Sequence, residues 1–347
     1  MKHYEDFEKE ARKYPEILKN YNSKGKVFKD PNFHPNCNIK ENEKVQFNEK
    51  DHIWERIDKY YTAPLFKKEL IHPDAIQQGE LGTCYFISSL SRIAQQPELV
   101  ELLFDTRTRS KPNNKKKAKE DEFVDTINLK CGAVIVYFHI FGRLTPVLID
   151  TLIPFRRGTR KPRFVHPSDL KFSPWFCLVE KAYAKLHGSY SIIEGGQLSK
   201  AIYNLFGYFP CYSRISSIIS KREEKLKKKR DLEKSTKPIK FDQNEYLFSR
   251  LMRWQRQNAI LGADIQNSDL PANITEENIL DSGLVTGHSY LIMKVRREQG
   301  KNFICLRNPW GDREWLGDWS DTSPLWTPEL KKALGVHIAE NGTFWMI

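Results

Sequence analysis

The stretch Gln78-Gly79-Glu80-Leu81-Gly82-Thr83-Cys84-Tyr85-Phe86 sets a cysteine at the expected start of a helix. Thr83 is of a residue type that favours the N-cap, and apolar residues recur after it at helical spacing as far as Pro97. Cys84 is therefore expected in the first turn, where the helix dipole favours the thiolate over the thiol. Gln78, returned by a turn between Gly79 and Gly82, can donate a hydrogen bond to an oxygen that gains negative charge. The alternative is a buried structural cysteine beside a loop glutamine.

A histidine and an asparagine downstream fit the other half of such a site. A nucleophilic thiol needs a base, and the base needs a group that orients it. Residues 287–295 and 303–308 are predicted as two strands joined by a polar turn, and Pro309 ends the second strand. In an antiparallel hairpin centred at residue 298, His288 and Asn308 are cross-strand neighbours, and a slip of two residues leaves them diagonal but within reach. The asparagine oxygen can then accept from one imidazole nitrogen and leave the other to face a thiol.

Taken together, these stretches make the sequence resemble the calpain family, the papain-like intracellular cysteine proteases. The resemblance covers most of the chain from about residue 25 on. Its departure from papain-like enzymes is Leu81, which stands where they carry a second cysteine, and the Cys-to-His separation is longer than theirs. The further matching stretches are Leu178–Tyr190, Glu194–Gly196, Gly283–Tyr290, Arg307–Gly311, Glu314-Trp315 and, more weakly, Val27–Phe33 and Gly342–Met346.

The resemblance implies an α+β fold of the papain type, with a helical lobe, a β-rich lobe and the active-site cleft between them. It implies Cys84 as nucleophile, His288 as general base, Asn308 as the residue that orients it and Gln78 as oxyanion donor. The implied function is an intracellular cysteine endopeptidase that acts on proteins or peptides through an acyl-enzyme. A calpain-like scaffold without protease activity, binding a partner through its cleft or its basic loops, is the alternative.

The chain is expected to divide into three parts. Residues 1–70 are polar and are interpreted as an N-terminal extension, with an extended arm over 22–48. Residues 71–207 are expected to form the helical lobe, with a hairpin of 134–137 and 147–153 and a helix over about 174–187. Residues 208–347 are expected to form the β-rich lobe, with a basic insertion at about 215–240.

The net charge of +12 is concentrated in two segments. Residues 107–119 hold seven basic residues and no acid, and residues 221–237 hold nine basic and four acidic residues, so the remainder is near neutral. The second segment is predicted to be helical over Arg222–Glu233. Both are interpreted as surface insertions that are either simply solvated or dock to an acidic partner, RNA or anionic lipid headgroups. Few aromatic residues lie within them, so specific recognition of nucleic-acid bases is not expected.

The remaining sequence features favour a cytoplasmic protein. Six cysteines, at positions 37, 84, 131, 177, 211 and 305, show neither disulfide-framework nor metal-ligand spacing. The N-terminus has no apolar core of a secretory signal, and the most apolar stretch, 134–153, is interrupted by Arg143, Pro146 and Asp150. There is no EF-hand pattern, and because the sequence stops at Ile347 the family's further C-terminal domains are expected to be absent.

The chemistry needs no cofactor, but the resemblance raises the question of calcium, since each lobe of a calpain carries a calcium site. Glu314 and Asp321 match two acidic ligands in the β-rich lobe, whereas two further acidic positions fall on Asn341 and Thr343. In the helical lobe the acidic positions fall on Ala75 and Ser191, with Asp74 and Glu194 close in sequence. Calcium affinity rises with the number of charged oxygens. We therefore expect at most one weak site, at Glu314 and Asp321, and partial or no stimulation by calcium.

Overall fold

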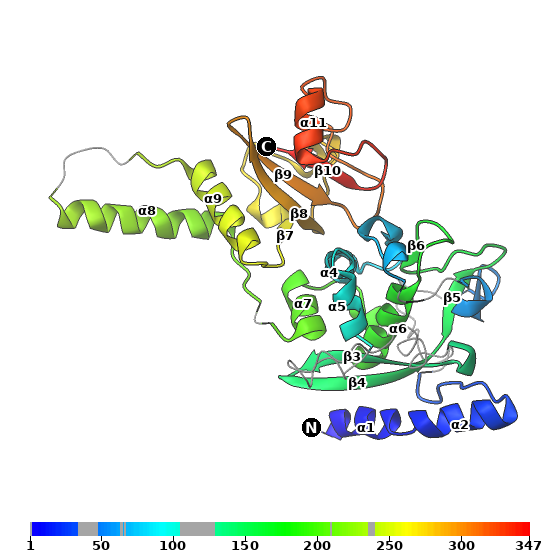
Figure 1. Cartoon of the computed structure of the whole chain (residues 1–347). Helices are drawn as coiled ribbons and strands as arrows, with labels where there is room; N and C mark the ends of the chain where they lie inside the picture. Colours follow the sequence, from blue (N-terminus) through cyan, green and yellow to red (C-terminus); the bar gives the residue numbers. More distant parts are fainter. Residues whose placement is uncertain are drawn as a thin grey trace, which may run out of the picture. The chain divides into compact units, whose positions relative to one another are not determined.

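The computed structural model describes residues 2–33, 48–62, 65, 67–104, 129–208, 210–234 and 240–347, with side chains from residue 5 (Figure 1). The basic segment 107–119 and Cys37 lie outside these residues. The chain divides into two compact units, of which unit 1 comprises Met1–Tyr208 with Pro309–Asp312, and unit 2 comprises Phe209–Asn308 with Arg313–Ile347. Both helices and antiparallel strands are present, as expected for the α+β fold.

Helix α6 (Trp175–His187) is the centre of the core of unit 1. Every residue from Trp175 to Leu186 is buried, and the helix ends at Gly188, whose φ of 109° suits glycine. The predicted helix over 174–187 is thus confirmed. The other helices of the unit are α1 (Lys2–Ala11), α2 (Tyr14–Lys24), α4 (Cys84–Ala94), α5 (Pro97–Leu102) and α7 (Leu198–Phe206).

The strands of unit 1 form three antiparallel pairs. The predicted hairpin is present as β3 (Ala133–Ile140) and β4 (Arg143–Asp150), with Val136 opposite Val147 and a tight turn at Phe141 and Gly142. The chain then continues into a separate strand, β5. The remaining pairs are β1 (His52–Arg56) with β5 (Leu152–Arg156) and β2 (Ile76–Gln77) with β6 (His166–Pro167).

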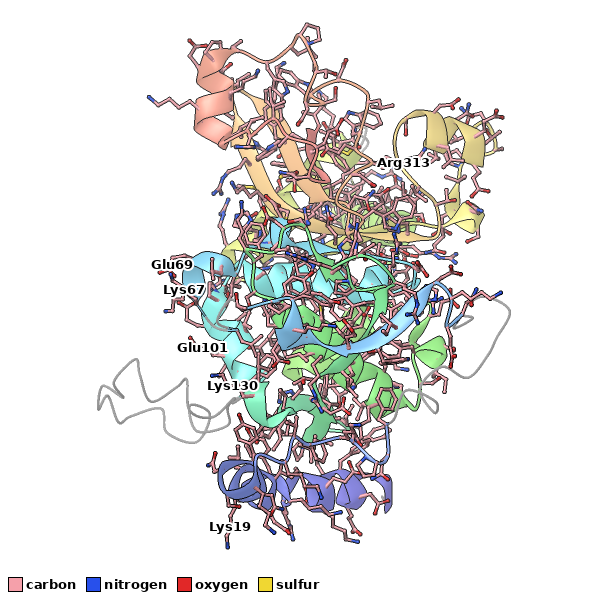
Figure 2. The ribbon with its side chains drawn as sticks, turned by 90° about the vertical axis from the view of Figure 1, so that its right-hand side faces the viewer. Lys19, Lys67, Glu69, Glu101, Lys130 and Arg313 are labelled. Carbon is pink, nitrogen blue, oxygen red and sulfur yellow. The ribbon has the colours of Figure 1, made fainter. Side chains whose placement is uncertain are left out.

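The first two helices pack on the β3–β4 hairpin. Figure 1 shows α1 and α2 along one side of this hairpin, with α6 and α7 on the other. Tyr14, Ile17, Leu18 and Tyr21 recur at helical spacing on α2 and pack with Ile135 and Leu148. Lys19, on the opposite face of α2, points into solvent (Figure 2).

A buried network of charges ties the N-terminal region to α6. Lys185 Nζ donates to Asp30 Oδ2 at 2.8 Å, to Glu10 Oε2 at 2.6 Å and to the Leu148 carbonyl at 2.8 Å. Lys181 Nζ pairs with Asp150, and the other Asp150 oxygen accepts from the Asp30 backbone N–H at 2.9 Å. Each buried ammonium thus has a carboxylate partner, as low-dielectric surroundings require.

Unit 2 is built on one four-stranded antiparallel sheet in the order β10-β9-β8-β7. Aromatic and aliphatic side chains, among them Phe303, Trp319, Trp326, Leu330 and Trp345, form one apolar cluster. Phe248, Ile292 and Val295 form a second cluster. The strands are β7 (Gly262–Ile265), β8 (His288–Glu298), β9 (Lys301–Arg307) and β10 (Thr343–Met346), and the helices include α9 (Gln243–Arg256), α10 (Glu276–Asp281) and α11 (Pro328–Leu334).

The second basic segment is largely helical, as predicted. Helix α8 (Ile215–Leu232) begins earlier than expected, and none of its residues is buried. It contacts α9 through a hydrogen bond from Gln243 to Glu223 and through Arg222 over the Tyr246 ring. No helix within the described ranges is long and apolar enough to cross a membrane.

Candidate active site

The loop that precedes Cys84 is fixed by backbone contacts on two sides. The Gln78 N–H donates to the Pro309 carbonyl at 2.9 Å, and the Glu80 N–H donates to the Arg163 carbonyl at 3.1 Å. A Cβ at Gly79 would lie 2.1 Å from the Phe164 carbonyl oxygen and 2.3 Å from that of Arg163, so only glycine fits there. The sequence Gln78-Gly79-Glu80 therefore forms a closely packed turn.

The Gln78 side chain lies at the inner side of this turn. Its Nε2 donates to the Leu81 carbonyl at 2.9 Å, and no second acceptor for Nε2 occurs among the described residues. An amide nitrogen carries two hydrogens, so one remains for an oxygen of a bound molecule. The Oε1 atom is buried and has no hydrogen-bond partner in the described part of the chain.

Cys84 is the first residue of α4, as the spacing of apolar residues predicts, and it is half-buried. Thr83 occupies the N-cap, and its carbonyl accepts from the N–H groups of Phe86 and Ile87 at 2.9 Å. The expectation that Thr83 occupies the N-cap is thus confirmed, although its side chain makes no capping hydrogen bond. The hydroxyl instead donates to Glu180 Oε1 at 2.9 Å, and both residues are buried.

Glu180 was not among the candidate residues. In the sequence it lies within the helix over 174–187 but away from its apolar stripe, where the period alone predicts a side chain that faces solvent. The available signal was an acidic residue directly after two apolar residues, Leu178 and Val179, of a helix expected in the core. Such a residue needs a hydrogen-bond donor from another element.

His288 and Asn308 lie together in unit 2. His288 Nε2 and Asn308 Oδ1 are 2.8 Å apart, with both residues buried. Asn308 Nδ2 donates to the carbonyl of Arg313 (labelled in Figure 2) at 2.9 Å, and its backbone N–H donates to the Gly342 carbonyl at 2.7 Å. Because the amide nitrogen is engaged by Arg313, the oxygen faces the ring, which makes Nε2 the protonated nitrogen and Nδ1 the basic one.

Burial lowers the pKa of His288, and the hydrogen bond to Asn308 opposes this shift. The ring also meets Tyr290 edge-on, with centroids 5.0 Å apart. The imidazole is thus held in one orientation and kept neutral near neutral pH.

The predicted register of this hairpin is wrong. Glu298 pairs with Lys301 around a turn of Gln299 and Gly300, both with positive φ, so the turn is shorter than the polar run 296–302. An irregularity between Ile292 and Lys294 then shifts the pairing, and Leu291 lies opposite Arg307. His288 and Asn308 are therefore not directly opposite, and they meet because Asn308 lies just beyond the end of β9.

The carboxylates at the expected calcium position lie in unit 2. Glu314 Oε1 accepts from the N–H groups of Asn341 and Gly342 at 3.1 and 2.8 Å, and Asp321 Oδ2 accepts from the Ala339 N–H at 3.1 Å. Burial, with a contribution from the charge of Asp321, raises the pKa of Glu314 to about 7, and burial raises the pKa of Asp321. A cation would relieve this repulsion, so the pair fits a calcium ion.

The donor set is small, however. Within the ranges that the structure describes, no group of three or more His, Cys, Asp or Glu side chains could hold a metal. In unit 1, Asp74 pairs with His72, and Glu194 lies against Gly82.

Comparison with known proteins gives the family. A family model described as "Calpain family cysteine protease" matches residues 28–347. The chain is 30% identical over 277 residues to the calpain-type cysteine protease DEK1 of Arabidopsis thaliana, which covers 79% of this chain and 11% of that protein. It is 29% identical over 352 residues to Calpain-A of Drosophila melanogaster, covering 97% of this chain and 36% of that protein. It is 28% identical over 311 residues to Calpain-5 of Mus musculus, covering 84% of this chain and 43% of that protein.

The chain thus spans about a tenth of the plant protein and less than half of the two animal proteins. The match extends over both units, from the N-terminal side of the Cys84 loop to the last strand, β10. Together with the helix-borne cysteine and the buried histidine–asparagine pair, it shows that the chain belongs to the calpain family of cysteine proteases.

Proposed function

We propose that this chain is the proteolytic core of an intracellular cysteine endopeptidase that cleaves proteins or peptides through Cys84, His288 and Asn308. The observation that carries this proposal is the buried 2.8 Å hydrogen bond between His288 and Asn308. A histidine whose ring is oriented by an asparagine oxygen, with Nε2 protonated and Nδ1 basic, is the arrangement that thiol activation needs.

In the proposed mechanism, Nδ1 of His288 takes the proton of the Cys84 thiol. The first turn of α4 supports the thiolate, because the positive end of the helix dipole lies there. Burial keeps the neutral form of His288 populated, as a base requires. Asn308 moves no proton, and its role is to hold the tautomer in which Nδ1 is basic.

The thiolate attacks the carbonyl carbon of the scissile peptide bond, and the carbonyl oxygen becomes an oxyanion. The remaining hydrogen of Gln78 Nε2 donates to that oxygen. As the C–N bond breaks, the protonated His288 gives its proton to the leaving amine and an acyl-enzyme remains on Cys84. Water then attacks the acyl carbon while His288 takes its proton, and breakage of the C–S bond regenerates the thiol.

Alanine variants assayed with a peptide substrate test this proposal. Cys84→Ala is expected to abolish turnover, and His288→Ala nearly so. Asn308→Ala should leave measurable activity, and Gln78→Ala should lower kcat about 10²-fold. Cys211→Ala, which changes an exposed cysteine, is the control and should retain full turnover.

Treatment of the intact protein with a thiol alkylator distinguishes a protease from a scaffold. The label is located by the mass shift of the peptide that contains Cys84. Selective labelling at Cys84 with turnover supports the endopeptidase. Hydrolysis retained by Cys84→Ala would contradict it, and intact protein that neither labels selectively nor hydrolyses peptides would favour the partner-binding scaffold.

We further propose one weak calcium site at Glu314 and Asp321, on the support of their raised pKa values and converging charge. A bound ion would neutralise these two carboxylates, and no step of hydrolysis passes through it. Calorimetric titration with calcium is expected to show at most one weak site, lost in Glu314→Gln. Two tight sites with strictly calcium-dependent turnover would contradict this proposal.

The proposal includes a reducing, cytoplasmic setting. Its support is the cysteine pattern, since Cys84, Cys131, Cys177, Cys211 and Cys305 are all in the thiol form. It also includes contact of α8 with acidic partners or membrane surfaces, supported by the basic composition of that helix and by the fact that none of its residues is buried.

A further inference from the structure

A buried carboxylate lies directly beneath the residue that precedes the nucleophile. Glu180, on α6, is 2% exposed, and Thr83, the N-cap of α4, is 0% exposed. The Thr83 hydroxyl donates to Glu180 Oε1 at 2.9 Å, and the Val165 N–H donates to Glu180 Oε2 at 3.0 Å. One side chain thus joins the start of the Cys84 helix to the segment before β6.

This carboxylate has no cation beside it in the described part of the chain, since the neighbouring Lys181 pairs with Asp150 instead. The groups whose pKa its charge affects are Cys177, Tyr85 and Tyr190, all of which are buried. Burial raises the pKa of Glu180 itself to about 7. An unpaired buried acid weakens a fold, so stability does not explain why an acid stands here.

Two features of the geometry explain better why position 180 carries an acid. A carboxylate accepts with both oxygens, so Glu180 accepts from the Val165 N–H and from the Thr83 hydroxyl at once, whereas a glutamine with its oxygen on Val165 could meet Thr83 only as a donor and would not accept the hydroxyl hydrogen. The hydrogen bond to Glu180 also turns the Thr83 hydroxyl away from the first turn of α4, where no side-chain cap is present. The N-terminal N–H groups of the helix are therefore not capped by the Thr83 hydroxyl, which leaves their partial positive charge to act on the Cys84 sulfur.

We propose that Glu180 is a positioning residue for the reaction at Cys84 and acts through the hydroxyl of Thr83. This inference rests on the proposed function, in which Cys84 is the nucleophile. The hydrogen bond fixes the backbone of Thr83, with φ −103° and ψ 26°, and thereby the place where the helix begins. Glu180 touches no substrate, so its loss changes the reactivity of the thiol and not the affinity for a peptide.

The test compares Thr83→Val, which removes the hydroxyl at nearly constant volume, with Thr83→Ser, which keeps it. Glu180→Gln removes the carboxylate, and the double variant Thr83→Val/Glu180→Gln tests whether the two residues act as one. Ser89→Ala is the matched control, because Ser89 carries a buried hydroxyl on the same helix that donates to the Tyr85 carbonyl. For each variant, kcat, KM and the rate at which iodoacetamide alkylates Cys84 are measured on protein whose folding is checked by circular dichroism.

Thr83→Val and Glu180→Gln are expected to lower kcat and the alkylation rate about tenfold or more, with KM changed less than twofold. Thr83→Ser and Ser89→Ala should remain near wild type, and the double variant should lose no more than the larger single loss. The inference would be overturned if Cys84 in Thr83→Val were alkylated at the wild-type rate, or if Thr83→Ser and Thr83→Val lost equal amounts of kcat and alkylation rate. Additive losses of these two rates in the double variant would overturn it as well. If Thr83→Val does not fold, the contrast between Thr83→Ser and Glu180→Gln decides the same point.

The alkylation rate does not depend on peptide hydrolysis. A wild-type chain that hydrolyses nothing would refute the proposed function, whereas the ratio of alkylation rates between Thr83→Ser and Thr83→Val would still decide the role of Glu180.

Discussion

Gly79→Ala adds one methyl group where the loop before Cys84 passes the chain at Arg163 and Phe164. The new Cβ would lie 2.1 Å from the Phe164 carbonyl oxygen, whereas an ordinary contact needs at least 3.4 Å, so the two backbones must separate by about 1.3 Å (3.4 minus 2.1). That separation breaks the 3.1 Å hydrogen bond between the Glu80 N–H and the Arg163 carbonyl.

The expected loss has two components. Overpacking costs about 1–3 kcal/mol, and the broken hydrogen bond costs about 1 kcal/mol. For a chain of this size, that corresponds to a decrease in melting temperature on the order of 5–10 °C. Because Gln78 is the preceding residue, a displacement of about 1 Å at the proposed oxyanion donor should lower kcat about 10²-fold.

Thermal melting followed by circular dichroism and hydrolysis of a peptide measure the two losses. Gly142→Ala is the matched control, since it adds the same methyl group in the β3–β4 turn, where nothing lies within 4 Å of the new atom. It should lose only about 1 kcal/mol from the left-handed φ of 76° and keep wild-type turnover. If Gly79→Ala melts and turns over like wild type, the loop is not held against residues 163 and 164 and the reasoning fails.

Three further perturbations test other parts of the chain. The pKa of Glu314 is raised to about 7, so the stability that its protonated form contributes is complete below about pH 4.5 and is lost as the pH rises through 7. Thermal melting at pH 5 and at pH 8 should therefore show that the wild type loses stability relative to Glu314→Gln as the pH rises. A difference between the two proteins that does not depend on pH would contradict the raised pKa. Deletion of residues 221–237 should leave hydrolysis of a small peptide unchanged, because no residue of α8 is buried; unfolding of the deletion variant would instead make the segment part of the core. Lys181→Met leaves Asp150 charged and buried without its partner, so urea unfolding should show a loss of about 3–5 kcal/mol, and a loss below 1 kcal/mol would refute the importance of this pair.

The sequence predicts best those features that depend on local periodicity. The helices that carry Cys84 and Glu180 follow from apolar residues spaced three and four apart, and both begin and end close to the expected residues. The same pattern at Tyr14, Ile17, Leu18 and Tyr21 identifies α2, although the polar composition of the first seventy residues masks it.

The register of the β8–β9 hairpin depends on which two residues of the polar run 296–302 form the turn, and polarity alone does not identify them. Gln299 and Gly300 alone form the turn, and Gly300 was its signal. The irregularity near Ile292 has no counterpart in the pattern of apolar residues. The predicted contact between His288 and Asn308 is present nevertheless, because a shift of two residues keeps both side chains on one face and within reach of each other.

Contacts between polar groups far apart in sequence could not be predicted. Thr83 and Glu180 are 97 residues apart, and Asp30 and Asp150 are 120 residues apart. A single sequence gives no information on which buried donor meets which buried acceptor, because the hydrogen bond depends on how whole elements pack.

The network around Lys181 and Lys185 has a consequence for where the chain can be shortened. With Glu10 removed, this network loses one of its three carboxylates, and its two ammonium groups face two, Asp30 and Asp150, so the network becomes electrically neutral. A chain that starts at residue 28, where the match to the family begins, would therefore hold a balanced network and lose the cover that α1 and α2 give to the β3–β4 hairpin. A chain that starts after residue 30 would leave Lys181 and Lys185 with Asp150 as the one remaining carboxylate of this network. Asp30 therefore sets how far unit 1 can be shortened from its N-terminal end without leaving an unbalanced buried charge.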